Sequence, residues 1–148
     1  MKDARRENDP LALQNQLCFP FYAISRKIIQ AYTPLLKPLD LTYPQYLCML
    51  VLWQDDEQTV GQLCYRLFLD TNTLSPLVRK LEAKGLITQK RPVSDRRRVH
   101  LYLTDKGKAL RQMAEGIPGA LIEQLESSPD QLEKIREQMW AFAEELRD

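Results

Sequence analysis

The apolar residues of this chain recur mostly with helical spacing, which predicts a mainly helical fold. Over residues 11–36 they are spaced by three and four, and this pattern predicts one long helix whose apolar positions are Leu17, Phe21, Ile24, Ile28, Ala31 and Leu35. Pro20 lies inside the pattern, so it either belongs to the first turn or kinks the helix. Pro34 and Pro38 mark where the helix ends.

Three shorter helices are expected next, over residues 42–53, 60–68 and 70–84. Thr42 is suited to cap the first of them, and Pro44 is tolerated in its first turn. A polar turn separates the first helix from the second. Either Asp70 or Thr71 caps the third helix, and Gly85 ends it.

The period then changes from helical to extended. Residues 86–90 and 99–103 are expected to form two short strands, and the polar loop 91–98 between them carries four arginines. This pattern predicts a β-hairpin with a charged tip.

The C-terminal part of the chain returns to a helical pattern. Thr104 caps a long helix that Gly116, Pro118 and Gly119 bend or break. A last helix over 129–146 has apolar positions at a 3-4-3-4 spacing, namely Leu132, Ile135, Met139, Phe142 and Leu146. That spacing is typical of a helix that packs on another helix, and we expect an intersubunit bundle.

Length and composition indicate one globular domain of 148 residues, 44% hydrophobic and 28% charged. The net charge is only +1, but the charges are sorted along the chain. Residues 79–98 hold eight Lys or Arg against two acids, whereas residues 112–148 hold nine acids against three bases. Such sorting favours one surface that binds anions and another that repels them.

No apolar run approaches the length of a membrane span, and residues 1–10 are polar, so we expect a cytoplasmic protein without a membrane partner. Cys18, Cys48 and Cys64 lack the spacing of a metal site or of a disulfide framework, and free thiols are expected. His100 alone completes no metal site, so neither a metal nor another cofactor is expected.

A short helix, a turn, a second helix and a basic hairpin follow one another in the order of a winged helix-turn-helix. In this class the second helix enters the major groove and reads base edges from its N-terminal residues. The residues expected there are Asp70, Thr71, Asn72, Thr73 and Ser75. Arg79 and Lys80, about two turns later, are suited to contact phosphates.

The hairpin tip is expected to reach the neighbouring minor groove, where the negative potential attracts arginine. Arg97 is the candidate for insertion, with Arg96 and Arg98 beside it, and Asp95 is expected to hold the Arg97 guanidinium by a charge-assisted hydrogen bond. A basic hairpin alone can be merely solvated, and polar residues at a helix start can be merely caps. Their combination in this order favours binding of double-stranded DNA.

Several motifs resemble the MarR family of bacterial regulators: Asp70-Thr-Asn-Thr-Leu-Ser-Pro-Leu77, Leu81-Glu-Ala-Lys-Gly-Leu-Ile87, Asp95-Arg-Arg97 and Leu103-Thr-Asp-Lys-Gly107. The resemblance covers nearly the whole chain. It implies a single domain over 1–148, mainly α with a small β-hairpin wing. The winged helix-turn-helix would cover about 42–111, and about 11–40 and 112–148 would form the dimerisation helices. It also implies a homodimer on a palindromic operator.

The N-terminal half is similar to the OhrR type, the repressors that sense organic hydroperoxides. The similarity lies in Leu17-Cys-Phe19, Tyr22, Ala31-Tyr-Thr-Pro-Leu35 and Leu41-Thr-Tyr-Pro-Gln-Tyr-Leu47. It implies that Cys18 is oxidised and the repressor then leaves DNA, with Tyr22, Tyr32 and Tyr43 around the thiol. Family members with a resolving cysteine carry it near the C-terminus. No cysteine follows Cys64 here, which implies the single-cysteine type that uses a small external thiol.

Helix geometry bears on the thiol independently of the family. Cys18 and Tyr32 are 14 residues apart, which puts them within about 40° of one helix face but roughly 21 Å apart along the axis. Tyr32 could therefore meet Cys18 only across two antiparallel helices of a dimer, whereas Tyr22 lies one turn from Cys18 in the same chain. Cys18 as a plain helix cysteine, and Cys48 and Cys64 as small core residues, remain the structural alternatives.

Four functions are thus in competition. The first is a homodimeric transcriptional repressor that an organic hydroperoxide switches through Cys18, which is not an enzyme. The second is a repressor released by a small lipophilic or phenolic ligand, with Cys18 structural. A thiol peroxidase would need a resolving cysteine and would have no use for a basic DNA-binding region. A winged helix that binds protein would have no use for Arg96, Arg97 and Arg98.

Overall fold

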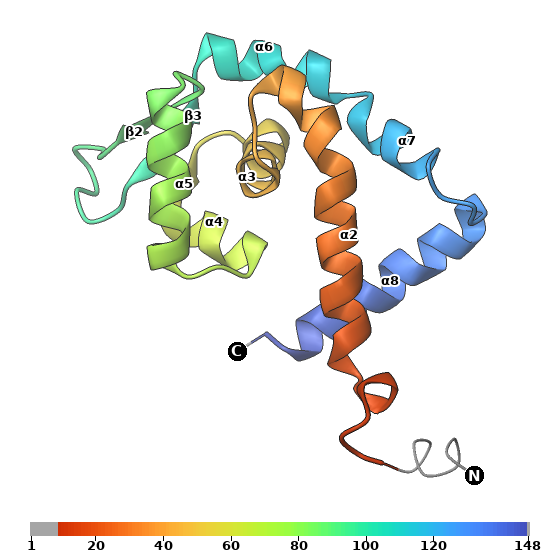
Figure 1. Ribbon diagram of the computed structural model, residues 1–148. Helices are drawn as coiled ribbons and strands as arrows, with labels where there is room; N and C mark the ends of the chain where they lie inside the picture. The colour runs from red at the N-terminus through yellow and green to blue at the C-terminus, as the bar shows by residue number, and fades with distance from the viewer. Residues whose placement is uncertain (1–8, 148) are drawn as a thin grey trace.

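The computed structural model describes residues 9–147, which form seven α-helices, two 3-10 turns and a three-stranded sheet. The elements are η1 (Leu13–Asn15), α2 (Cys18–Leu36), η2 (Lys37–Leu39), α3 (Tyr43–Gln54), β1 (Gln58–Thr59), α4 (Val60–Leu67), α5 (Thr71–Ala83), β2 (Ile87–Lys90), β3 (His100–Leu103), α6 (Asp105–Ala114), α7 (Ile117–Ile122) and α8 (Pro129–Glu145). In Figure 1 a head made of α3, α4, α5 and the strands lies beside the long rod α2, and α8 crosses the far end of that rod.

The expectation of one helix over 11–36 is wrong at its beginning, because α2 starts at Cys18. A helix that reached further back would press the Pro20 ring against the carbonyl of Gln16, four residues earlier. The chain forms the turn η1 instead, where the Gln16 side-chain amide donates to the carbonyls of Pro10 (2.7 Å) and Ala12 (3.1 Å). Pro20 thus lies in the first turn of α2.

Polar side chains begin the other long helices as the sequence predicts. Thr42 and Gln45 form a reciprocal capping box at α3, and Thr104 caps α6. Asp70, rather than Thr71, caps α5 by accepting the Thr73 N–H at 2.7 Å. The end of α5 is also confirmed, since Gly85 has φ +71°, the left-handed conformation that favours glycine.

The hairpin prediction is confirmed, but the sheet has a third strand. β3 lies in the middle, antiparallel to β2 on one side and to β1 on the other. β1 pairs Gln58 with Leu101 and Thr59 with His100. The turn before it requires φ +64° at Glu57, whose carboxylate accepts the Tyr102 hydroxyl at 2.8 Å. The wing is therefore fastened to the residues that lead into α4.

The core of the molecule lies in the head. It is built around α3 and contains Leu36, Tyr46, Cys48, Met49, Leu52, Leu63, Leu74, Val78, Leu81, Leu86, Ile87 and Leu101 among its buried side chains. α2 enters this core only at its C-terminal end, where Leu36 is fully buried. Within residues 9–147, no helix has both the length and the apolar content to cross a membrane.

The rest of α2 and all of α8 leave apolar side chains in solvent. No residue of α8 is buried, and one aromatic stack, Phe21 on Phe142 at 5.1 Å between ring centroids, joins it to α2. The exposed apolar side chains of these two helices and the adjoining segments, called the apolar stripe below, are Leu13, Leu17, Phe19, Tyr22, Ile24, Ile28, Ile29, Ile122, Leu125, Ile135, Met139, Trp140 and Leu146.

Gly107 is a point of very close approach inside α6. A Cβ built on this residue would lie 2.1 Å from the backbone oxygen of Leu86 and 3.3 Å from the Leu103 side chain. The Gly107 carbonyl also accepts the Trp53 indole N–H at 2.8 Å. This glycine therefore lets α6 pack directly on the backbone at the start of the wing.

Replacing Gly107 by alanine should lower the free energy of unfolding by about 3 kcal/mol, since the methyl group overpacks against backbone that cannot rotate away. Alanine would normally stabilise a helix interior, so the expected sign is the reverse of the propensity. Urea denaturation of G107A measures the change. The control is G116A, where the added Cβ meets nothing within 4 Å; equal effects of the two substitutions would contradict the packing argument.

Candidate DNA interface and thiol site

The turn between α4 and α5 fixes the angle between the two helices. Phe68 takes the left-handed conformation with φ +54°, and the Leu69 N–H donates to the carbonyl of Cys64 at 3.0 Å. The Cys64 thiol lies 3.9 Å from the hydroxyl of Thr71, the first residue of α5. The beginning of α5 is thus held by side-chain and backbone contacts from α4.

α5 presents the residue types that a recognition helix needs. Leu74, Val78 and Leu81 are buried on its inner face, whereas Thr71, Asn72, Thr73, Arg79 and Lys80 are exposed. Two of the residues predicted to contact bases make hydrogen bonds within the helix itself. Asp70 caps the helix, and the Ser75 hydroxyl donates to the Thr71 carbonyl at 2.7 Å. The N–H groups of the helix start hold the pKa of Asp70 below its usual range, so this carboxyl stays ionised.

The expectation that Asp95 holds the Arg97 guanidinium is wrong. The Asp95 carboxylate accepts the backbone N–H of Arg97 at 3.1 Å and lies 3.5 Å from the guanidinium of Arg98, not that of Arg97. The reason is a tight turn in which the Arg98 N–H donates to the Asp95 carbonyl, so residue 98 comes back beside residue 95. The Arg97 side chain is left exposed at the tip.

A groove of about 780 Å³ lies between the recognition helix α5 and the wing. It runs between the start of α4, the start of α5 and the wing, and it brings Thr71 and Ser75 together with Arg97 and Arg98. No carboxylate is among its lining residues in the described part of the chain. Arg66 also lines the groove, but Asp55 holds its guanidinium at 2.8 Å. The groove therefore offers cationic and hydroxyl groups to an anionic ligand.

The start of α4 also faces this groove, which the sequence analysis did not predict. Thr59 and Gln62 form a capping box there, and both residues line the groove with Gly61. The signal was present as Thr-x-x-Gln before an apolar run, the sequence pattern of a capping box. Gln89 of β2 lines the groove as well, although Glu82 already accepts its side-chain amide at 2.7 Å.

Cys18 is the first residue of α2, and its thiol is exposed and not in a disulfide. The N-terminal end of a helix carries a partial positive charge that favours anions. Tyr22 lies one turn further along α2, also exposed, and its hydroxyl accepts a hydrogen bond from Arg26 at 2.9 Å. Cys18 and Tyr22 therefore share the exposed end of α2.

The other two predicted tyrosines lie at the opposite end of α2. Tyr32 packs on Tyr43 at 4.8 Å between ring centroids, and Tyr46 of α3 completes the cluster at 5.8 Å from Tyr32. Burial, helped by the neighbouring phenols, raises the pKa of Tyr32 to about 12, and burial raises the pKa of Tyr43 and Tyr46 as well. All three therefore remain neutral hydrogen-bond donors at neutral pH.

Tyr46 was missed by the sequence analysis, although its spacing of three from Tyr43 puts the two phenols on one face of α3. Its hydroxyl is buried and has no hydrogen-bond partner among the described residues. Within one protomer, then, Cys18 and Tyr22 lie one helical turn apart at one end of α2, and Tyr32 packs on Tyr43 at the other. The two pairs are separated by most of the length of α2.

Cys48 and Cys64 differ from Cys18 in their surroundings. Cys48 is fully buried in the core, and desolvation raises the pKa of its thiol to about 12. Cys64 is half-buried between α4 and α5. Cys18 is thus the exposed thiol of the three.

A short helix, a recognition helix and a basic wing around one cationic groove define a winged helix-turn-helix, the architecture of DNA-binding transcriptional regulators. Residues 30–113 match the family described as transcriptional regulator SarA/Rot. The organic hydroperoxide resistance transcriptional regulator of Bacillus subtilis is 40% identical, over 93% of this chain and 94% of that protein. The chain belongs to the MarR family of transcriptional regulators, in the OhrR-type branch.

Solved structures of AbfR of Staphylococcus epidermidis are also similar. Reduced AbfR bound to DNA is 32% identical, matches 96% of this chain and 99% of that chain, and superposes with a TM-score of 0.74. The disulfide form of AbfR is 32% identical, matches 99% of this chain and 98% of that chain, and superposes with a TM-score of 0.63.

Replacing Arg97 by alanine should weaken DNA binding about tenfold and reduce the slope of log affinity against log salt by about one, because one cation is lost from the interface. Fluorescence anisotropy with a labelled duplex at several salt concentrations measures both quantities. R111A removes a charge from α6, away from the groove, and should change neither. An unaltered salt slope in R97A would show that the wing tip does not meet DNA.

Proposed function

We propose that the protein is a homodimeric repressor that binds a palindromic operator and leaves it when an organic hydroperoxide oxidises Cys18. The observation that supports the proposal is that Cys18 and the two buried tyrosines lie at opposite ends of α2. Cys18 lies at the exposed end, and the neutral phenols Tyr32 and Tyr43 lie at the other. An antiparallel α2 from a second protomer would bring the two ends together.

The apolar stripe supports the dimer. A single chain leaves Leu17, Ile24, Ile135 and Trp140 between 49% and 68% exposed, together with the rest of the stripe. Apolar surface of this extent is rarely left in water and marks an interaction surface. The stripe occupies the helices whose 3-4 spacing predicts helix packing, so a second copy of the same helices is the occupant that fits it.

A symmetric dimer would present two recognition helices. To read successive major grooves on one face of a duplex, they must lie roughly 34 Å apart, which makes the operator a palindrome. Thr71, Asn72 and Thr73 at the exposed start of α5 would contact base edges and phosphates, with Arg79 and Lys80 on the phosphate backbone. The arginines at the wing tip would enter the adjoining minor groove.

The oxidation chemistry needs only the thiol, the peroxide and a small thiol. The Cys18 thiolate attacks one peroxide oxygen, an S–O bond forms as the O–O bond breaks, and the alkoxide leaves as an alcohol after taking a proton. The resulting sulfenic acid condenses with a small thiol, giving a mixed disulfide and water. The phenol hydroxyls of Tyr32 and Tyr43 would donate to the thiolate, and the apolar residues Leu17 and Phe19 on either side of Cys18 in the sequence would favour apolar peroxides over hydrogen peroxide.

Release follows from geometry. A mixed disulfide at Cys18 adds bulk and polarity to an apolar helix seam, which must shift to accept it. A change in the spacing of the recognition helices would remove several phosphate contacts at once, and affinity falls steeply with each one lost.

The variant C18S should bind the operator as tightly as the wild type but stay bound after one equivalent of an organic hydroperoxide with a small thiol present. Serine keeps the size of the side chain and has no oxidisable sulfur. Anisotropy of labelled upstream DNA measures binding before and after oxidation. C64S is the matched control and should still be released.

Release of C18S by peroxide would overturn the thiol switch. A repressor released by a small lipophilic or phenolic ligand would then be the better interpretation, and a ligand-dependent rise in Tm independent of Cys18 would support it.

Mixed dimers test whether the site is shared between protomers. In a dimer of one C18S protomer and one Y32F/Y43F protomer, a shared site leaves one Cys18 facing wild-type tyrosines, so the mixed dimer should react with peroxide at the wild-type rate. The Y32F/Y43F homodimer should react about tenfold more slowly, because the thiolate has lost two donors. Stopped-flow measurement of thiol loss on purified mixed dimers gives both rates. Slow reaction in the mixed dimer would place the site within one protomer.

A further inference from the structure

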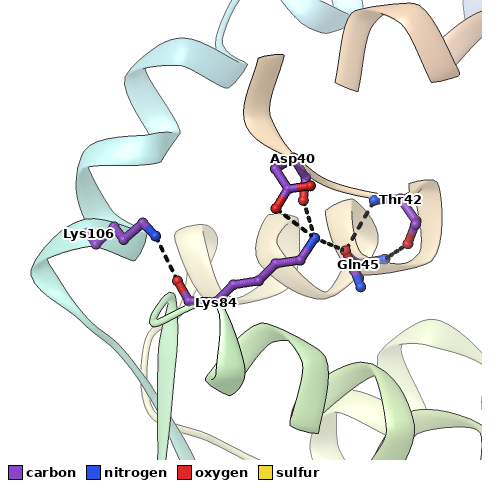
Figure 2. Close-up of polar contacts among 5 residues, drawn as sticks. All are labelled: Asp40, Thr42, Gln45, Lys84 and Lys106. Carbon is purple, nitrogen blue, oxygen red and sulfur yellow. Dashed lines mark hydrogen bonds and ion pairs between the residues drawn. The ribbon is translucent and has the colours of Figure 1, made fainter. Parts of the chain in front are cut away.

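The C-terminal end of the recognition helix is tied to the segment that joins α2 to α3. This segment, residues 37–42, is called the corner below; it contains η2 and turns the chain from the α2 rod into the head. Lys84, the C-cap of α5, reaches across to it. Figure 2 shows the Lys84 ammonium between Asp40 and Gln45, with Lys106 approaching the Lys84 backbone from the other side.

The Lys84 ammonium has three acceptors. It donates to the backbone carbonyl of Asp40, lies 3.1 Å from the Gln45 side-chain oxygen and 3.3 Å from the Asp40 carboxylate. The Asp40 side chain is 87% exposed, so its ion pair contributes little. The carbonyl and the Gln45 oxygen, by contrast, are fixed acceptors, and Asp40 itself is set in the left-handed conformation with φ +52°.

Gln45 makes the contact rigid. It is only 2% exposed, the one buried polar residue of the described chain. Its side-chain oxygen accepts the Thr42 N–H at 3.2 Å as well as the Lys84 ammonium. One buried oxygen therefore closes the cap of α3 and also holds α5, and neither helix can turn at this end without breaking the shared contact.

α6 joins the same point. The Lys106 ammonium donates to the Lys84 carbonyl at 2.8 Å, and the Thr104 hydroxyl donates to the neighbouring carbonyl of Gly85 at 2.6 Å. These bonds satisfy carbonyls that the end of a helix leaves unpaired. The last turn of α5 is thus fixed from the corner on one side and from α6 on the other.

We propose that Lys84 is a positioning residue of the recognition helix: it sets the direction of α5 relative to α2, and through α2 it sets the spacing of the two reading heads. The inference rests on the proposed function where it concerns a palindromic operator. The intramolecular geometry that it claims exists without DNA.

The first test measures that geometry directly. Spin labels on Q30C of α2 and T73C of α5 are placed in a C18S/C64S background, where Cys48 is buried, and diluted with an excess of unlabelled protein so that each distance lies within one protomer. K84M keeps the aliphatic stem and removes the donor, and it should broaden or shift the α2–α5 distance distribution. K84R should restore it.

The matched control is K37M, which removes the same charge from the same corner, because Lys37 makes no polar side-chain contact among the described residues. It should leave the distribution as in the parent protein. Equal distributions in K84M and K37M would overturn the proposal whether or not the protein binds DNA. Thermal melts of both variants distinguish a change in the direction of α5 from a loss of folding.

The second test uses DNA. K84M should lose about tenfold in affinity for a duplex that carries both half-sites, because simultaneous binding of two heads depends on their spacing. Its affinity for a half-site duplex should change by less than about twofold, since one head needs no partner. An equal loss on both duplexes would make Lys84 a DNA contact or a general stabiliser and would overturn the proposal. Absence of wild-type DNA binding would refute the proposed function, and the spin-label distances would still decide the role of Lys84.

Discussion

The structure depends on one constraint: a single helix, α2, has to serve both the head and the interface. Its C-terminal end is part of the head core, where Leu36 is buried and Tyr32 packs on Tyr43. Its N-terminal two thirds expose apolar side chains that one protomer cannot cover. Because α2 is one continuous helix from Cys18 to Leu36, a displacement at its Cys18 end could be passed on to the corner. The proposed oxidation of Cys18 could therefore be coupled to DNA binding without a flexible linker.

The charges of the chain are also divided between the head and the helices of the interface. The basic residues 79–98 cover the end of α5 and the wing, whereas α7 and α8 both lie within the acidic part of the chain that follows residue 112. A duplex would be attracted to the head and repelled by the helices of the interface, which favours productive orientations in the encounter. Arg147 is a basic residue in the mainly acidic C-terminal part of the chain. Its guanidinium lies over the rings of Tyr65 (4.0 Å) and Phe68 (3.8 Å), so this cation joins the chain end to the α4–α5 turn.

Much of the fold could be predicted from local patterns, because caps and turns are local interactions. Thr42, Gly85 and Thr104 end or cap their helices through neighbours within a few residues, and the structure confirms all three. Of the two candidates for the cap of α5, Asp70 and Thr71, the structure selects Asp70. The strand β1 could not be predicted in this way. It has two residues, too few for any period, and it exists because it pairs with Leu101 and His100 of β3, about forty residues away.

The candidate site likewise contains features that local sequence patterns predict and others that depend on distant contacts. That Cys18 and Tyr32 lie too far apart to meet within one helix follows from helix geometry alone. The third phenol, Tyr46, and the Arg98 partner of Asp95 depend on packing and on a turn that residue types do not specify. Lys84 shows the limit most clearly. Its sequence position indicates only a basic residue near a helix end, and its role appears when Gln45, 39 positions earlier, is found buried beside it.

The burial of the phenols also bears on how the switch could operate. Tyrosines with raised pKa values cannot act as bases at neutral pH, so they cannot deprotonate a thiol. In the proposed switch their contribution would be to donate hydrogen bonds to the sulfur, which would favour a thiolate over a thiol. A mixed disulfide at Cys18 would replace the anionic acceptor by neutral sulfur, which is a weak acceptor, and would leave these donors poorly satisfied at an apolar seam. Leaving such donors unpaired is costly, so the same hydrogen bonds that favour the reactive thiolate would destabilise the DNA-binding arrangement once it is consumed.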